Sequence, residues 1–236
     1  MDVISFVNQK GGTGKSLLAI NLSVTAEATG EKVCLIDLDQ QGTAAHWYET
    51  RTAETPAVLN HEQAGNLAEV LIQLAAGGFT LVIIDTKGED SHGTRGAMQA
   101  AQLCLIPIRP AGPDLHASRP TMEALRAMKR DFVLVVNQAT PNKAAKITAA
   151  VMASLSHDGP VMPTAIASRM DHQYAYALGQ GAIEYDAGGK AAEEINELWA
   201  WCRKKLARNP TANQATKPPQ SNLSGNERLC ETPHLQ

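Results

Sequence analysis

The residues whose types and spacing most clearly indicate a chemical function lie near the N-terminus, in the run Gln9-Lys10-Gly11-Gly12-Thr13-Gly14-Lys15-Ser16. The run separates an apolar segment, 3–7, from a helical pattern that begins at Leu17. Glycines let backbone N–H groups curl around phosphate oxygens, and the N-terminus of a helix favours negative charge. The types and spacing of these residues therefore predict a triphosphate site. A glycine-rich turn that only packs a helix on a sheet is the alternative.

The end of this run fits the phosphate-binding pattern G-x-x-x-x-G-K-[ST], although Gln9 stands where the pattern has its first glycine. In that pattern the lysine bridges the β- and γ-phosphates and the hydroxyl ligates Mg²⁺. We therefore predict that Lys15 binds phosphate and that Ser16 is a metal ligand. The predicted nucleotide-binding residues of the run are Gly11, Gly12, Thr13, Gly14, Lys15, Ser16 and Leu17.

Three aspartates stand at the ends of apolar runs. Asp37 and Asp39 follow 33–36, and Asp85 closes 81–84 in a Walker B pattern. Ligands bind at the carboxyl ends of parallel strands, so these side chains should reach the same site as the glycine-rich run. We expect Asp85 to hold Mg²⁺ through a water. Two acids that cap the next helix are the alternative for Asp37 and Asp39.

The elements that must position these residues form an alternating pattern. Continuous apolar runs predict buried strands at 3–7, 33–36, 81–84, 103–106 and 132–136, with a last short strand at 161–166. Helical patterns lie between them at 16–29, 63–76, 115–130, 142–155 and 190–208. We predict an α/β fold of three layers, with a mostly parallel twisted sheet covered by helices on both faces.

The bulk composition fits one globular domain. Hydrophobic residues make up 44%, charged residues 19%, and the net charge is −3, which argues against a protein coated in positive charge but leaves room for a local basic patch. Cys34, Cys104, Cys202 and Cys230 show no metal-type spacing, and the first two are expected to be reduced packing residues. No leader and no apolar run of about 18 residues is visible, so we expect a cytoplasmic protein without a membrane partner. Residues 1–208 are predicted to form the domain and 209–236 a disordered tail.

The run Lys10-Gly11-Gly12-Thr13-Gly14-Lys15-Ser16 resembles the deviant Walker A motif of the ParA/MinD ATPases. The resemblance implies ATP hydrolysis with Mg²⁺ by a homodimer in which Lys10 touches the nucleotide of the partner subunit. It also implies that Asp37 sits near Mg²⁺ and that Asp39 orients the attacking water, in a motif that the family writes D-x-D-P-Q-G and that has Gln40 for the proline here. Lys10, Lys15 and Asp39 are thus the predicted catalytic residues. A solvated surface lysine is the alternative for Lys10.

Later segments match the same family in the correct order. The resemblance implies that Asn137 reads the adenine edge and that the loop of Pro163 and Thr164 flanks the base, whereas an ordinary turn residue is the alternative for Asn137. The family commonly continues its Walker B strand with Pro-Pro or Gly-Ala-Gly, and this chain differs there, at 87–90. The resemblance covers residues 1–206.

The compact length resembles the small ParA partition ATPases of plasmids. In that group an ATP-bound sandwich dimer binds DNA non-specifically on the nucleoid, and a ParB-type adaptor or centromere-binding protein stimulates hydrolysis. Non-specific binding needs clustered cations aimed at phosphates. The predicted DNA-binding residues are Arg169, Lys190, Arg203, Lys204 and Lys205. Basic residues in a final helical turn also complement the helix dipole, which is the alternative.

Other functions on this fold stay open or are disfavoured. A MinD-type membrane-cycling ATPase would carry an amphipathic basic helix at its end, but 220–225 has no apolar face. Iron–sulfur reductases need paired cluster cysteines, and Lys10 argues against a metabolic ligase. An ATP-dependent scaffold that coats DNA or forms filaments remains the alternative, as does a MinD-like positioning ATPase for a non-DNA cargo. The cargo could be a plasmid, a chromosome origin, a carboxysome or a chemoreceptor array.

Overall fold

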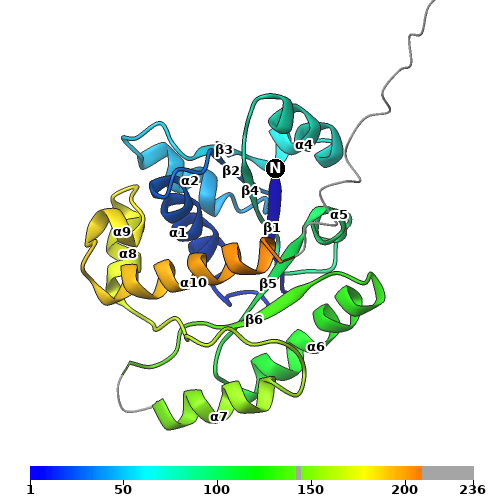
Figure 1. The fold of residues 1–236 in the computed structure, drawn as a ribbon, viewed down its shortest axis with the longest axis vertical. Coiled ribbons are helices and arrows are strands. Elements are labelled where there is room, and N and C mark those ends of the chain that lie inside the picture. Colours follow the sequence, from blue (N-terminus) through cyan, green and yellow to red (C-terminus); the bar gives the residue numbers. More distant parts are fainter. Residues whose placement is uncertain (142–144, 209–236) are drawn as a thin grey trace, which may run out of the picture.

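A parallel six-stranded sheet forms the centre of the molecule in a computed structural model that describes residues 1–141 and 145–208. The strand order is β3-β2-β4-β1-β5-β6, and every neighbouring pair is parallel (Figure 1). The order reverses at β1, so β4 and β5 lie on its two sides. The strands are β1 (Asp2–Phe6), β2 (Val33–Asp37), β3 (Ala57–Leu59), β4 (Leu81–Asp85), β5 (Leu103–Ile108) and β6 (Phe132–Val136).

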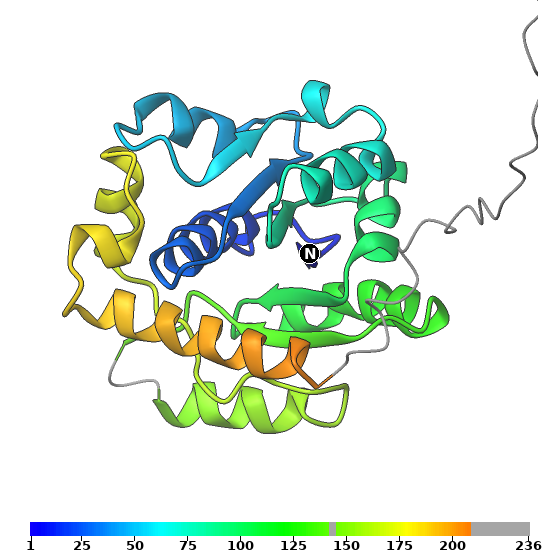
Figure 2. The same cartoon turned by 45° about the horizontal axis from the view of Figure 1, so that its top comes forward.

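Helices cover both faces of this sheet, in the two groups visible in Figures 1 and 2. On one face pack α1 (Lys15–Ala28), α2 (Thr43–Thr50), α8 (Met170–Ala177), α9 (Ala182–Tyr185) and α10 (Lys190–Leu206). On the other pack α3 (His61–Ala64), α4 (Leu67–Ala76), α5 (His92–Ala100), α6 (Gly112–Ala127) and α7 (Ala145–Leu155). The predicted three-layer α/β fold is confirmed.

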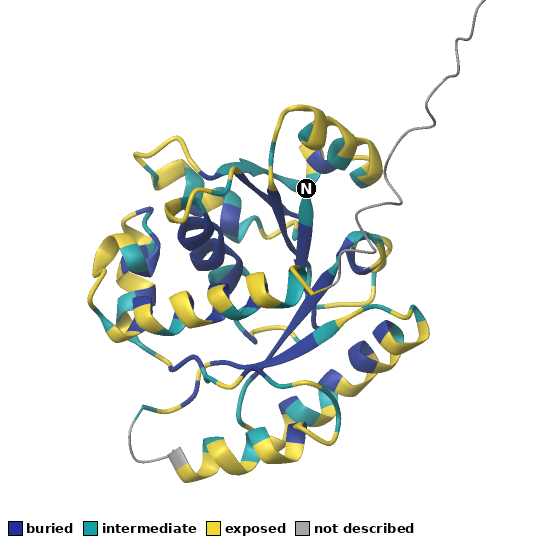
Figure 3. Cartoon of the chain, in the orientation of Figure 1, coloured by how far each residue is buried: buried dark blue, intermediate teal, exposed yellow. Residues whose placement is uncertain are grey.

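The continuous apolar runs are explained by burial on both faces of the sheet. Successive side chains of a strand point to opposite faces, so Ile4 and Phe6 enter one core cluster while Val3 and Val7 enter the other. The strands are accordingly dark in the burial view of Figure 3, while the outer helix surfaces are exposed. Burial of each such aliphatic or aromatic side chain contributes about 1.5–3 kcal/mol to the free energy of folding. The sheet is therefore a stable base for the site.

Two of the predicted elements are corrected. The helix expected at 63–76 is divided by Gly65 into α3 and α4, and Asn60 forms a capping box with Gln63 at the start of α3. The last strand expected at 161–166 is wrong: the segment makes only isolated bridges, Leu134 to Val161 and Ala139 to Ala167. The N–H of Met162 donates to the Leu134 carbonyl oxygen, but the next bond to β6, at the Val136 carbonyl oxygen, comes from Ile166 and not from Thr164, so residues 163–165 interrupt the pairing.

Several further elements escaped prediction, namely β3, α2, α5, α8 and α9. The predicted tail at 209–236, the start of the helix expected from 142, and Cys230 lie outside the described residues. In the described part, Cys34, Cys104 and Cys202 are buried free thiols, as expected of packing residues. Burial raises the pKa of Cys34 and of Cys104 to about 12. None of the helices in the described part has the length and apolar character needed to cross a membrane.

Candidate nucleotide site

The glycine-rich run forms a tight loop between the end of β1 and the start of α1. Gly12 and Gly14 have φ angles of 74° and 87°, a left-handed conformation that favours glycine. Gly14 is also the N-cap of α1, so it offers no side chain to the free N–H groups of the first helical turn. With Gly11 and Gly12 exposed and Lys15 buried, the loop presents its backbone and the helix N-terminus to an anion from outside.

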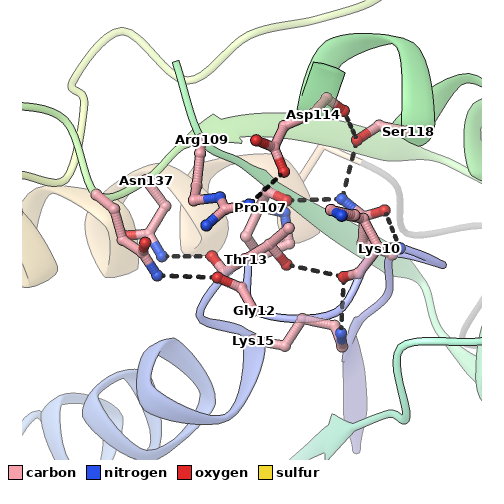
Figure 4. A network of polar contacts seen from close by, with 11 residues as sticks. Lys10, Gly12, Thr13, Lys15, Pro107, Arg109, Asp114, Ser118 and Asn137 are labelled. Atoms are coloured by element: carbon pink, nitrogen blue, oxygen red, sulfur yellow. Dashed lines mark hydrogen bonds and ion pairs between the residues drawn. The ribbon is translucent and has the colours of Figure 1, made fainter. Parts of the chain in front are cut away.

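The loop is held from behind by the end of β6. Asn137 donates a 2.8 Å hydrogen bond from Nδ2 to the carbonyl oxygen of Thr13, and Gln138 donates from Nε2 to that of Gly12 at 3.2 Å (Figure 4). A Cβ at Gly14 would lie 2.3 Å from Asn137 Nδ2, so this support requires glycine there. In this structure the Asn137 amide steadies the phosphate loop, and reading of an adenine edge by this residue stays a prediction.

The front of the loop is anchored by Asn8, a fully buried residue that the sequence reasoning missed. Its Oδ1 accepts a 3.0 Å bond from the backbone N–H of Lys10, while its Nδ2 donates to the Pro107 carbonyl oxygen at 2.8 Å and to Ser118 Oγ at 3.0 Å (Figure 4). The backbone N–H of Gln9 also donates to a threonine hydroxyl of α6, at 3.1 Å. The position of Lys10 is therefore fixed by β5 and α6. The only feature of the sequence that could have indicated this role is an amide residue directly after a predicted strand.

The two lysines of the loop have different environments. Lys15 is buried, and its Nζ donates to the carbonyl oxygen of Lys10 at 3.4 Å (Figure 4). Burial lowers the pKa of Lys15, while the charges of Asp85 and Asp39 oppose the shift. Lys10 is half-exposed, and within residues 1–141 and 145–208 no hydrogen bond or ion pair engages its ammonium group. Its backbone is thus held while its side chain is available to a group from outside the chain.

The predicted carboxylates gather at the same edge of the sheet. Asp37 and Asp85 are paired in register at the ends of β2 and β4. Both carboxylate oxygens of Asp85 are buried and without a hydrogen-bond partner in the described part of the chain. Burial raises the pKa of Asp85 to about 7; the nearby charges of Asp37 and Asp39 add to the shift, while Ser16 and Lys15 oppose it.

These oxygens fit a divalent cation. Mg²⁺ prefers hard oxygen ligands and is usually bound through one or two carboxylates together with substrate phosphates. Asp85 supplies buried carboxylate oxygens that lack a partner, and Ser16 places its hydroxyl beside them on the first turn of α1. The donor set at the phosphate loop is therefore of the kind that Mg²⁺ requires.

Asp37 and Asp39 are used differently. Asp37 Oδ2 accepts from the backbone N–H groups of Ala44 and Ala45, at 2.8 and 3.2 Å, and Oδ1 accepts from that of Asp39 at 3.0 Å. Asp37 therefore caps α2, which confirms the capping alternative for this residue, and its place near a metal ion stays a prediction. Asp39 is half-exposed, and among the described residues its carboxylate accepts only from the Gln41 N–H, at 3.0 Å, so it remains available to a water.

A pocket of about 190 Å³ lies beside the loop, where the sequence predicted the base. Pro163 and Thr164 do not line it: Pro163 is exposed, and the Thr164 hydroxyl donates to Glu197 on α10. The wall instead comes from the following residues, with His172 as an unanticipated member whose two ring nitrogens have no partner in the described part. Burial lowers the pKa of His172. The lining residues are Leu17, Leu18, Asn137, Gln138, Ile166, Ala167, Ser168, Arg169, His172 and Gln173.

The predicted DNA-binding residues fall at the two ends of α10. Arg169 pairs with Glu194 at 2.6 Å, and Lys190 pairs with Glu193, so both cations near the start of the helix are matched by carboxylates. The other three stand about 20 Å along the helix, where Arg203 and Lys204 are exposed and Lys205 lies over the Trp201 ring at 5.1 Å. The structure does not bring the five together.

The end of α10 lies far from the phosphate loop. Lys205, Leu206 and Arg208 line a hollow with Leu103 and Phe132, the first residues of β5 and β6. The phosphate loop follows the last residue of β1, at the opposite edge of the parallel sheet. The basic end of α10 and the nucleotide site are thus on opposite sides of the domain.

A glycine loop between β1 and α1, a lysine behind it and an aspartate at the end of a neighbouring parallel strand define a P-loop nucleotide-binding protein. A family model confirms this class: residues 4–179 match the CobQ/CobB/MinD/ParA nucleotide binding domain. The chain belongs to this family and is a P-loop ATPase of the ParA/MinD type, which uses ATP and Mg²⁺.

Similar proteins fall in the same group. The carboxysome distribution protein A of Halothiobacillus neapolitanus is 29% identical over 83% of this chain and 93% of its own length. The chromosome partitioning protein ParA of Caulobacter vibrioides is 51% identical, over 45% of this chain and 55% of its own length. Among solved structures, MinD of Pyrococcus horikoshii OT3, complexed with Mg-ADP, superposes with a TM-score of 0.69 at 18% identity, covering 89% of this chain and 99% of that one. This likeness confirms the fold.

Proposed function

We propose that this ATPase forms an ATP-bound sandwich dimer that binds DNA non-specifically on the nucleoid and positions a large cargo through an adaptor protein of the ParB type. The observation that carries the proposal is the arrangement of Lys10. Its backbone N–H is fixed by Asn8, while its ammonium is unengaged by the described residues. A cation held at the mouth of a phosphate loop, without a partner among the described residues of its own chain, is suited to the nucleotide of a second copy.

Each residue around the phosphate loop has its own role in the proposed hydrolysis of ATP. Lys15 and the loop N–H groups bind the phosphates of ATP, and Ser16 and Asp85 hold Mg²⁺, which neutralises negative charge on the terminal phosphates. Asp39 orients the attacking water for in-line displacement, because its carboxylate is half-exposed and lies close enough to Lys15 to influence its pKa. Lys10 stabilises the charge on the transferring phosphoryl group of the partner subunit.

The DNA contact is assigned to the basic end of α10, with Arg203 and Lys204 as its exposed members. Non-specific binding requires only cations aimed at backbone phosphates, and these residues lie in the last turns of a rigid helix. Arg169 and Lys190 are weaker candidates, since their charges are already paired with Glu194 and Glu193.

Two cargoes have support of different kinds. Similarity to the carboxysome distribution protein extends over nearly that protein's whole length, which favours a protein-shelled body as cargo. Similarity to the chromosome partitioning protein is higher in identity but spans about half of each chain, and it favours a DNA cargo such as a plasmid. Both cargoes need the same nucleotide-gated dimer on DNA, and the adaptor makes the choice between them.

The decisive experiment measures binding to random-sequence duplex DNA with ATP, with ADP and without nucleotide, at one stated salt concentration. We expect binding with ATP alone, lost in Lys10→Ala and kept in Lys146→Ala, which removes an exposed lysine of α7 as a matched control. Stimulation of turnover by an adaptor would then favour the positioning function, and tight assembly without stimulation a scaffold. Absence of DNA binding in every nucleotide state would contradict the proposal.

A further inference from the structure

The segment that follows β4 is clamped against the phosphate loop. The hydroxyl of Thr86, a buried residue, donates to the Phe6 carbonyl oxygen at 2.8 Å, which ties the segment to the end of β1. Two residues later, a Cβ on Gly88 would lie 2.9 Å from Gly11 Cα and 3.0 Å from Gly11 N. The backbones of the two segments are therefore in direct contact at Gly88, and the residue between these anchors is held beside the loop.

That residue is Lys87, and its ammonium is in a weak ion pair. It lies 2.9 Å from Glu89 Oε1, with the two side chains 39% and 51% exposed. An exposed pair of this kind is weak because water screens it, so another anion can displace the carboxylate. The hydrogen bond to Glu89 raises the pKa of Lys87, and the charge of Asp39 adds to this shift.

Asp39 also locates Lys87 relative to the nucleotide. The same carboxylate acts on the pKa of Lys15, the lysine of the phosphate loop, so Lys15 and Lys87 are both within electrostatic reach of one acidic group. Asp39 is the residue to which we assign the attacking water. A cation beside it is therefore next to the terminal phosphate of a bound triphosphate.

We propose that Lys87 distinguishes triphosphate from diphosphate within its own chain, by exchanging the Glu89 carboxylate for the γ-phosphate. The inference rests on the nucleotide site proposed above. Only a triphosphate places an anion at this position, so the exchange can occur with ATP and not with ADP. A phosphate carries more negative charge than a carboxylate, which favours the exchange. Lys87 thus acts in cis, whereas Lys10 acts on the partner's nucleotide.

The test compares affinities for a fluorescent ADP and for a fluorescent non-hydrolysable ATP analogue, both with Mg²⁺. All variants carry Lys10→Ala, so that dimer formation does not contribute. We expect Lys87→Met to weaken binding of the ATP analogue about tenfold, as for the loss of one charged hydrogen bond, and to change the affinity for ADP by no more than about twofold. Lys87→Arg should retain most of the preference, because the positive charge is kept. Glu89→Gln should strengthen binding of the ATP analogue and leave the affinity for ADP unchanged, because it removes the carboxylate that pairs with Lys87.

A neighbouring ion pair supplies the control. Arg95 makes a two-bond contact with Asp90, at 2.7 and 2.6 Å, in the same stretch of surface. Asp90→Asn should leave the ratio of the two affinities unchanged. Equal losses of affinity for both nucleotides in Lys87→Met would overturn the inference about Lys87 and leave the nucleotide site standing. An unchanged ratio of the two affinities in both Lys87→Met and Glu89→Gln would do the same. If the chain with Lys87 intact binds neither nucleotide, the proposed nucleotide site itself is wrong. The same conclusion follows if Lys15→Ala still binds both nucleotides.

Discussion

The side-chain amide of Asn137 donates a 2.8 Å hydrogen bond to the carbonyl oxygen of Thr13, and so joins the end of β6 to the phosphate loop across the sheet. The bond is buried, and the amide also packs against Gly14, where no side chain would fit. The shape of the loop is therefore set by a residue more than a hundred positions later in the chain.

Removal of this amide should loosen the loop. Asn137→Leu leaves a buried carbonyl without its donor, which costs about 1–3 kcal/mol of the unfolding free energy and weakens nucleotide binding. Gln138→Ala is the matched control, because its 3.2 Å bond to Gly12 is exposed and contributes little. Urea denaturation and nucleotide titration of both variants check the prediction. Equal effects of the two substitutions would contradict it.

The two left-handed glycines of the loop should respond differently to alanine. Gly12 has no atom within 4 Å of an added Cβ, so Gly12→Ala incurs only the left-handed backbone strain of about 1–2 kcal/mol. Gly14→Ala incurs the same strain and drives its Cβ into Asn137 Nδ2. We expect Gly14→Ala to be the less stable variant and to lose nucleotide binding. Chemical denaturation of the pair isolates the contact, and similar stabilities would refute its importance.

Asp39 should be required for turnover and not for binding. Asp39→Ala removes the group that orients the attacking water, so we expect dimers with bound ATP that persist without hydrolysis, visible by light scattering and phosphate release. Gln40→Pro restores the proline usual at that position in the ParA/MinD family, and should keep hydrolysis. Normal turnover by Asp39→Ala would remove the role assigned to this residue.

Stability without nucleotide and Mg²⁺ should fall as pH rises, because of Asp85. Its pKa is about 7 in the folded chain, whereas an unfolded aspartate titrates near 3.8. Between these values the folded state keeps a proton that the unfolded state has lost, so the unfolding free energy decreases from about pH 4 to pH 7. Asp85→Asn removes this dependence and should be more stable at pH 8 by as much as about 4 kcal/mol.

Denaturation at pH 5 and pH 8 measures this difference. Asp37→Asn is the control, because Asp37 accepts bonds from the N–H groups that begin α2 and its loss should destabilise the chain at both pH values. A pH-independent stability of the unaltered chain, or an Asp85→Asn variant that is less stable at pH 8, would contradict the prediction.

The sequence allowed the layers, most strands and the phosphate loop to be predicted, because these depend on local patterns. Apolar runs such as 81–84 show burial directly, and Gly14-Lys15-Ser16 is a contiguous motif. The short β3 has only the residues Ala57–Leu59, and α5 carries three buried side chains, so neither produces a strong apolar period.

The rest depends on contacts between distant segments. The role of Asn8 follows from α6 and β5, which lie about a hundred positions away. The pocket beside the phosphate loop is lined by residues from Ile166 onward and not by Pro163, because residues 163–165 interrupt the pairing with β6 and Ile166 resumes it at Val136. The pairing of Arg169 with Glu194 depends on the segment before α8 lying beside the start of α10, 25 positions later in the chain.

The separation of the basic end of α10 from the phosphate loop has a consequence for regulation. Nucleotide at one edge of the sheet need not reshape a surface at the other edge to change the affinity for DNA. In the proposed dimer the two nucleotide faces meet, so the two basic ends point away from each other and contact separate stretches of one long DNA molecule. The second contact then becomes intramolecular, and affinity increases through avidity. The salt dependence of binding, which follows the number of phosphates contacted, should then be about twice as steep for the dimer as for one chain.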